Sequence, residues 1–207
     1  NLEGQIGQPL RYKPNGSDFI ITNGKEFFNR PLYGGNTAFR VDAGDLPEFV
    51  LYLPGRGGNL RFGIQNNSSK AWLHELSQIR TIYRPGSMIY EIQDQEMLGE
   101  QGMIRICAIA TYEIEGLVLS VEATNLNNTL KLFWAYGGVN GERGVRDGDI
   151  GTEKVPISQW FQLKPEFAKD NHYKINKSTF TLSSKAGRII GAFPEDSELS
   201  LNDAQHW

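Results

Sequence analysis

Hydrophobic and polar residues alternate along much of the chain, in short runs separated by turns that contain glycine or proline. The clearest run spans residues 117–124, where Leu, Leu, Val and Ala alternate with Val, Ser, Glu and Thr. A period of two places successive side chains on opposite faces of a strand, so one face of this strand is expected to point inward. Residues 103–112, rich in isoleucine and alanine, predict a second, buried strand.

Short turn sequences pair the predicted strands into hairpins. Asn-Gly at 23–24 tolerates positive φ at both central positions and predicts a type I′ hairpin. Pro-Gly at 85–86 and the glycine-rich stretch 55–58 join two further pairs of runs, and residues 178–193 read as one more hairpin.

Helical patterns are few. Residues 69–79 predict a short helix and residues 164–171 a single helical turn. Many short strands with turns every 8 to 12 residues are typical of an all-β fold, here a large antiparallel β-sandwich with few short helices. Without a repeat or a linker, residues 1–207 are expected to form a single domain.

Composition narrows the possible partners. The 207 residues carry a net charge of −3, which provides no basic field for nucleic acid. No apolar run approaches the ~20 residues that span a bilayer, so no membrane span is expected. The single cysteine, Cys107, cannot form an internal disulfide and is predicted to be a small buried residue of its strand.

The segment 133–153 contains six glycines and is the most unusual part of the sequence. A phosphate-binding loop would need a following helix and a Gly-Lys-Ser/Thr sequence, and neither is present. An EF-hand that began at Asp147 would place Ser158 where a bidentate glutamate belongs. An ordered turn, with Asp147 as its cap, is therefore preferred over an ion site, and no metal or cofactor is expected.

The same segment supplies groups that bind sugars, namely an aromatic face and planar polar side chains. Trp134 alternates in phase with Leu130 and Leu132, which favours a place in the core. Tyr136 and the charged residues of the loop are predicted to be exposed. The candidate carbohydrate- or partner-binding residues of this segment are Tyr136, Arg143, Arg146, Asp147 and Asp149.

Catalytic patterns are sparse. His74, His172 and His206 lack metal-ligand spacing to one another, and no Gly-x-Ser-x-Gly sequence occurs. The linear spacing of carboxylates cannot reveal the pair that glycoside hydrolysis requires. No catalytic residue is predicted.

The stretch ATYEIEGLVLSVEATNLNNTLKLFWAYGG, residues 110–138, resembles the central strands of galactose mutarotase-like proteins. The resemblance implies a β-supersandwich. This architecture also forms the N-terminal domain of multi-domain glycoside hydrolases, where it packs on a helical catalytic barrel. Mutarotases carry a catalytic histidine in the aromatic-rich strand, whereas residues 134–138 contain none, so epimerase activity is not expected.

A second resemblance covers more of the chain. Residues 23–49, together with FWAYGG, RDGDIG and the stretch from Leu163 to Phe180, are similar to a bacterial domain of unknown function, number 4450. Similar domains stand at the N-terminus of secreted polysaccharide-degrading proteins. The resemblance therefore implies the N-terminal part of a longer exported protein, periplasmic or at the bacterial cell surface.

The block 29–34 of this resemblance adds two candidate residues. Pro31 favours extended geometry at Arg30, and the following glycines permit a bend. Arg30 is either a structural clamp, which is preferred, or a fork that holds a ligand, and Tyr33 is a further binding candidate.

These observations favour a non-catalytic accessory domain of a bacterial polysaccharide-degrading system. Its expected partners are carbohydrate, a C-terminal catalytic domain, or both. The alternative is a sugar-active enzyme, either an epimerase or a small glycoside hydrolase, with a site that the sequence does not reveal.

Overall fold

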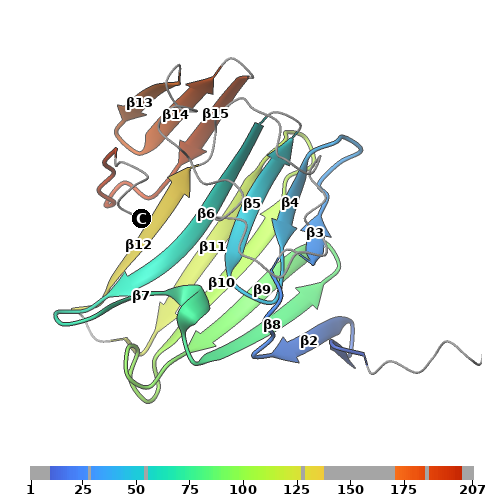
Figure 1. Ribbon diagram of the computed structural model, residues 1–207, viewed down its shortest axis with the longest axis vertical. Helices are drawn as coiled ribbons and strands as arrows, with labels where there is room; N and C mark the ends of the chain where they lie inside the picture. Colours follow the sequence, from blue (N-terminus) through green and yellow to red (C-terminus); the bar gives the residue numbers. More distant parts are fainter. Residues whose placement is uncertain are drawn as a thin grey trace, which may run out of the picture.

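The computed structural model describes residues 10–27, 29–53, 56–126, 129–137, 171–184 and 187–201. These residues form three antiparallel sheets (Figure 1). The strands of the first, sheet A, are β1 (Lys13–Asn15), β2 (Asp18–Thr22), β8 (Gln78–Arg84), β9 (Ser87–Gln93), β10 (Met103–Ala110) and β11 (Leu117–Thr124). They lie side by side in the order β1-β2-β8-β9-β10-β11.

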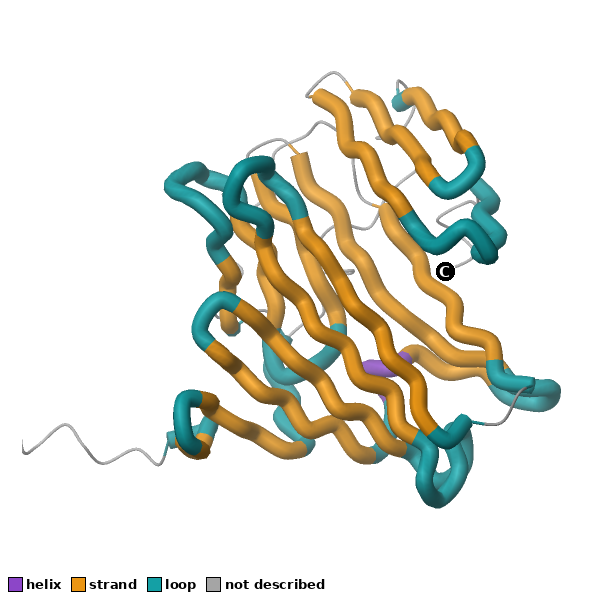
Figure 2. Tube along the Cα trace, turned by 180° about the vertical axis from the view of Figure 1, so that it is seen from behind, coloured by secondary structure: helices purple, strands orange, loops and turns teal. Residues whose placement is uncertain are grey.

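The second sheet, sheet B, packs against sheet A. Its strands are β3 (Arg30–Leu32), β4 (Arg40–Ala43), β5 (Glu48–Leu53), β6 (Arg56–Gln65), β7 (Lys70–Trp72) and β12 (Lys131–Gly137). They follow the order β12-β6-β5-β4-β3, with β7 paired to β6. Sheet B is in front in Figure 1, and Figure 2 shows sheet A from behind.

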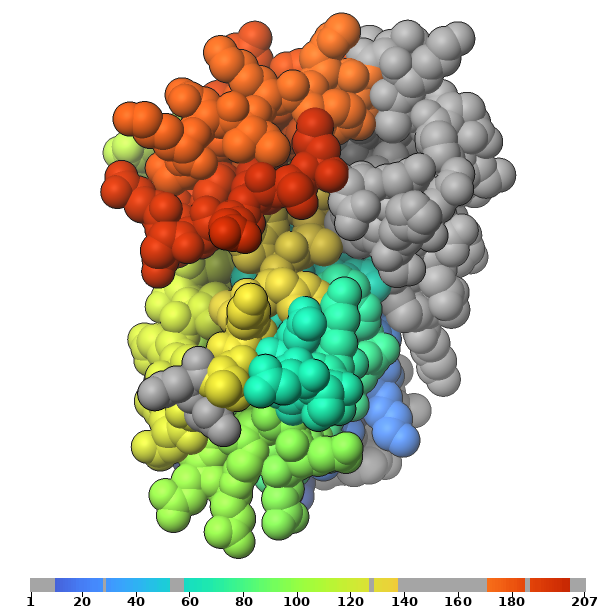
Figure 3. Space-filling view, turned by 90° about the vertical axis from the view of Figure 1, so that its left-hand side faces the viewer, coloured from blue at the N-terminus to red at the C-terminus, as the bar shows by residue number. Residues whose placement is uncertain are grey.

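A small third sheet, sheet C, covers one end of sheet B. Its strands, in spatial order, are β13 (His172–Asn176), β14 (Thr179–Ser184) and β15 (Gly187–Ala192). Figure 3 shows these residues, in orange and red, stacked above β12 and the β6–β7 region.

The core lies between sheets A and B and follows from alternation along each strand. In β4, Val41 and Ala43 are buried in the core, so Arg40 and Asp42 point to the outer side of sheet B. In β10, Ile104 and Ile106 face the core in the same way. The all-β sandwich predicted from the alternation is thereby confirmed.

The hairpin predicted at 85–86 is confirmed, since β8 and β9 pair directly across it and Gly86 has a φ of 88°. The pairings β5–β6 and β14–β15 are confirmed as well, but residues 56–58, predicted as part of the first turn, belong to strand β6 and pair with β5. The turn at 85–86 succeeds as a prediction because its chemistry is local.

The hairpin predicted at 23–24 is wrong. Asn23 does have positive φ, but its amide bonds the carbonyl of Ile79 and its side chain accepts from the Ile79 amide. The chain thus leaves sheet A at Asn23, and β2 pairs instead with β1 through a turn at Gly16. A distant strand satisfies the groups that a hairpin would have used.

The helix predicted at 69–79 is also wrong. Strand β7 ends at Trp72 and is followed by η1 (Leu73–Glu75), a single 3-10 turn. The Glu75 carboxylate accepts from the Trp72 amide at 3.1 Å, which caps the turn. The turn predicted at 164–171 lies outside the described residues except for its last position.

Cys107 is half-buried, not fully buried as predicted. Its neighbours Ile106 and Ala108 face the core, so the thiol points to the outer side of sheet A. On β11 the alternation is confirmed, with residues such as Leu119 half-buried and Ser120 exposed.

Candidate functional site

Most of the predicted glycine-rich site lies outside the described residues. This applies to four of its candidates, Arg143, Arg146, Asp147 and Asp149. Tyr136, Arg30 and Tyr33 lie within the described part of the chain, on β12 and on or after β3.

The prediction that Tyr136 is exposed is wrong. Its hydroxyl is buried without a hydrogen-bond partner, and burial raises its pKa above the ordinary value. The ring lies 5.9 Å from that of Phe180 in β14. A Cβ at Gly58 would meet the hydroxyl at 2.0 Å, so the tyrosine occupies space that only glycine leaves free. Tyr136 thus joins sheet B to sheet C.

Trp134 lies beside Tyr136, and its predicted place in the core is confirmed. Its ring contacts Phe180 at 6.0 Å and Phe193 at 5.8 Å between centroids. Such ring pairs contribute about 0.5–1.5 kcal/mol beyond the area that they bury. The aromatic strand β12 therefore serves packing between sheets.

Arg30 has the geometry of a clamp. Its guanidinium lies 4.5 Å from the ring centroid of Tyr12, and Nη1 donates to the carbonyl of Asn29 at 2.7 Å. The stacking holds the segment before β1 against β3.

The same region is anchored by a buried carboxylate, that of Asp45, in the loop between β4 and β5. It accepts from the Tyr12 hydroxyl at 2.7 Å, the Glu26 amide at 3.0 Å and the Asn29 amide group at 3.1 Å. Arg11 completes the set with an ion pair to Asp45. These partners compensate the cost of burying the charge, so Asp45 is a structural anchor.

Tyr33 is exposed and lies beside the hairpin of β10 and β11. A Cβ at Gly34 would fall 1.8 Å from the carbonyl oxygen of Thr111, so the loop after β3 touches that hairpin backbone to backbone. A Cβ at Gly35 would lie 3.2 Å from the carbonyl oxygen of Tyr112. Figure 2 shows the two loops side by side at the upper left.

This end of the sandwich gathers exposed apolar side chains, which we name the hairpin patch. Ile109 and Val118 face each other across β10 and β11, and Ile114 and Tyr112 stand in the connecting loop. The exposed fractions are 59% for Tyr33, 41% for Ile109, 82% for Tyr112, 70% for Ile114 and 51% for Val118.

The loop that carries the patch is fixed by Thr111. Its amide donates to the carbonyl of Gly116 at 2.9 Å, and its hydroxyl donates to the carbonyl of Ile114 at 2.5 Å. The exposed residues therefore stand on an ordered turn. Two carboxylates, Glu113 and Glu115, are exposed in the same loop.

A second cluster lies on the outer side of sheet B. Asp42 is buried and accepts from Nε of Arg40 at 2.9 Å, and the guanidinium of Arg40 lies 4.1 Å from the ring centroid of Tyr52. Burial raises the pKa of the Asp42 carboxyl to about 6, against the opposing charge and hydrogen bond of Arg40.

Glu48 repeats this arrangement one strand further along. Its Oε1 accepts from the Asn59 amide at 2.7 Å and lies 3.4 Å from Nη2 of Arg61. Arg61 in turn lies 4.9 Å from the ring centroid of Trp72. The other oxygen, Oε2, is buried without a partner. Of the two carboxylates, Glu48 is therefore the one whose second oxygen is available to accept a hydrogen bond.

His74, in the turn after β7, contributes to the electrostatics of this cluster. Burial lowers its pKa, against the attraction of the Glu48 carboxylate, and its Nδ1 is buried without a partner. Its ring meets that of Phe27 edge-on at 5.9 Å. Packing accounts for the position of His74 without a metal.

The described ranges contain no group of three or more His, Cys, Asp or Glu side chains placed to hold a metal ion. None of the helices in the described part of the chain has the length and apolarity to cross a membrane.

Sequence reasoning missed the hairpin patch and both outer carboxylates. One signal for the patch was present, because Ile114 is an apolar residue between two glutamates in the short segment that separates two predicted strands. The strands that carry Asp42 and Glu48 had to be paired before the two side chains could be brought together.

Comparison with known proteins gives one match. No curated protein and no solved structure matches the chain. The family model named Domain of unknown function (DUF4450) matches residues 53–207, so the Asn29–Tyr33 block lies before the matched region. Since the match covers well over half of the sequence, the chain belongs to the DUF4450 family.

Proposed function

We propose that this domain is a non-catalytic accessory module of a bacterial polysaccharide-degrading system, and that the hairpin patch docks it against a catalytic domain. The observation that carries the proposal is the concentration of exposed apolar side chains at one end of the sandwich. The patch consists of Tyr33, Ile109, Tyr112, Ile114 and Val118, which lie on the loop after β3 and on the β10–β11 hairpin that this loop touches.

The chemistry of the patch favours a protein partner over a sugar. Three of its five members are aliphatic and β-branched, whereas sugars stack on flat aromatic faces. Contiguous exposed apolar surface with a polar rim is typical of protein–protein contacts. Glu113 and Glu115 supply that rim, so the partner surface is expected to be apolar at its centre and basic around it.

The glycan-degrading context rests on the resemblance of residues 110–138 to galactose mutarotase-like domains. In multi-domain glycoside hydrolases such domains pack on a helical catalytic barrel. An exported location, periplasmic or at the cell surface, belongs to the same proposal.

Photo-crosslinking tests the docking. A photoreactive phenylalanine derivative replaces Ile114 in the natural full-length protein, and the crosslinked peptides are identified after irradiation of the producing cells. We expect crosslinks to a glycoside hydrolase catalytic domain, either in the same polypeptide or in a partner. The matched control carries the derivative at Glu100, an exposed residue in the loop at the other end of β10. If both positions give the same crosslinks, or position 114 gives none, the docking proposal is wrong.

A second candidate function, a small glycoside hydrolase, is favoured by Asp42 and Glu48. Asp42 is the register partner of Val50, so Glu48 is its diagonal neighbour on the outer side of sheet B, with Cα atoms about 7–8 Å apart. A carboxyl group with a raised pKa beside a second carboxyl group is the pairing that glycoside hydrolysis uses. Release of nitrophenol from aryl glycosides, abolished by Glu48→Gln, would support this candidate. An absence of turnover on all of them would end it.

A further inference from the structure

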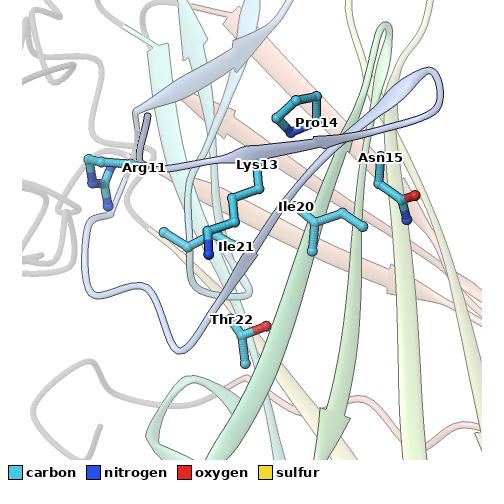
Figure 4. A pocket seen from close by; sticks show the side chains of 7 residues that line it. All are labelled: Arg11, Lys13, Pro14, Asn15, Ile20, Ile21 and Thr22. Carbon is cyan, nitrogen blue, oxygen red and sulfur yellow. The ribbon is translucent and has the colours of Figure 1, made fainter. Parts of the chain in front are cut away.

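Two shallow hollows meet on sheet A at Thr22. The first has a volume of about 340 Å³ and is lined by residues of β1 and β2, among them Lys13, Asn15 and Ile20 (Figure 4). The second has a volume of about 310 Å³ and continues across β8 and β9. Its lining includes Gln78, Arg80, Glu91 and Gln93. We name the two hollows together the sheet A groove.

The register shows that the groove belongs to the outer side of the sheet. Ile21 pairs with Thr81, and the neighbouring strand turns Tyr90 toward the core. The residues that alternate with these, Thr22 and Arg80, therefore point away from the core. Figure 4 shows Lys13 and Pro14 on opposite sides of β1, as this alternation requires.

Most charges on the walls of the groove are paired. Arg80 and Glu91 pair at 2.5 Å across β8 and β9. Two more ion pairs lie on the same side of the sheet, Arg84–Asp18 at 2.8 Å and Arg105–Glu122 at 3.6 Å. Arg11, which lines the first hollow, pairs with Glu26 and Asp45, and Lys13 in the same lining adds one positive charge. This surface therefore presents many hydrogen-bonding groups with only a small excess of positive charge.

Amides and aliphatic carbons complete the lining. Gln78 and Gln93 are register partners, both exposed, and present paired amide groups at one end of the groove. Ile20 is half-buried in the lining of the first hollow and adds apolar contact area. Amide groups can donate to and accept from hydroxyls, so the paired glutamines suit a ligand rich in hydroxyl groups.

The occupant that fits this surface is a neutral glycan. An anionic polymer would need a larger excess of basic side chains than Lys13 provides, since the arginines of the groove are paired with carboxylates. An extended peptide would add itself to a sheet edge, where backbone groups are free, whereas the groove crosses the face of paired strands. From β1 to β9 the groove spans three strand spacings, about 14 Å, which is room for a short stretch of a polysaccharide.

We propose that the sheet A groove binds an extended, uncharged polysaccharide that lies across the strands. This inference rests on the proposed function and names the glycan class that the accessory domain recognises. It places glycan contact on the face of sheet A and protein docking at the hairpin patch. The domain can therefore bind a glycan and a protein partner at the same time.

Affinity electrophoresis tests the proposal directly. The domain, residues 1–207, migrates through native gels that contain xylan, mannan, mixed-linkage β-glucan or dextran, and in parallel through gels with polygalacturonate or alginate. We expect at least one neutral polymer to retard it. The double variant Gln78→Ala/Gln93→Ala should weaken that binding about tenfold, since each substitution removes hydrogen bonds to the ligand.

Gln65→Ala is the matched control, because it removes an exposed amide from sheet B and should leave retardation unchanged. The native domain, the double variant and the control should have equal melting temperatures, so that a change in retardation reports binding and not a loss of folding. Free migration through every neutral polymer would overturn the proposal, as would retardation by the acidic polymers alone or equal binding by the double variant. Crosslinking at position 114 is independent of these gels, so either proposal can fail while the other holds.

Discussion

The buried carboxylate of Asp45 accepts a hydrogen bond from the Tyr12 hydroxyl at 2.7 Å, across 33 positions of sequence. This contact ties the segment before β1 to the loop between β4 and β5, and hence the edge of sheet A to sheet B. Arg30 contacts the same tyrosine, since its guanidinium lies over the Tyr12 ring. The Asp45 carboxylate and its hydrogen-bond partners thus hold the N-terminal part of the described chain in place.

Asp45→Ala is expected to destabilise the domain by about 3–5 kcal/mol, because it leaves Arg11, Tyr12 and Asn29 without their buried acceptor. Urea unfolding measures the loss. The control is Asp18→Ala, which removes a carboxylate from a surface ion pair with Arg84 and should change the unfolding midpoint little. Equal effects of the two substitutions would contradict the anchoring role of Asp45.

Tyr136→Phe and Tyr136→Ala are expected to act in different ways. The phenylalanine removes only a buried hydroxyl that has no partner, so the free energy of unfolding should stay the same or rise by up to about 1 kcal/mol. The alanine leaves a cavity beside Phe180 and should cost about 3–5 kcal/mol. Thermal unfolding distinguishes the two variants. An alanine variant as stable as the native protein would show that the Tyr136 ring is not packed against Phe180 and is exposed instead.

Gly34→Ala is expected to destabilise by about 1–3 kcal/mol, because its Cβ would fall 1.8 Å from the carbonyl oxygen of Thr111. Gly35→Ala is the matched control, with its nearest neighbour 3.2 Å away, and should cost less. Chemical unfolding compares the two. If Gly34→Ala proved the milder change, the loop after β3 would not lie against the hairpin as described.

Stability is expected to respond to pH through Asp42. Its pKa of about 6 in the folded protein exceeds the ordinary value of 3.8, so the folded state holds a proton that the unfolded chain has released between these values. The contribution of Asp42 therefore falls as pH rises through this window, by about 3 kcal/mol in all.

Asp42→Asn removes this titration. The free energy of unfolding of the variant, relative to the native protein, should rise between pH 4 and pH 6 and level off above. Urea titrations at half-unit steps of pH measure the difference, in which the other carboxylates cancel. A difference that stays constant with pH would show that Asp42 ionises normally in the folded state.

The sequence determined the elements whose causes are local. Period-two alternation identified β11 as a strand, and a run rich in isoleucine and alanine identified β10. Pro-Gly at 85–86 placed the turn between β8 and β9, because turn chemistry acts over a few residues.

The contacts between distant segments could not be predicted from the sequence and follow from the tertiary structure. Asn23 turns away from a hairpin because Ile79, more than fifty positions later, supplies its hydrogen-bond partners. Tyr136 is buried because Phe180 packs on it from sheet C, and Asp42 and Glu48 share a face only once β4 and β5 pair in register. A one-dimensional pattern indicates on which side of a strand a residue lies. The surface that covers this side depends on how the sheets pack, and their strands come from distant parts of the sequence.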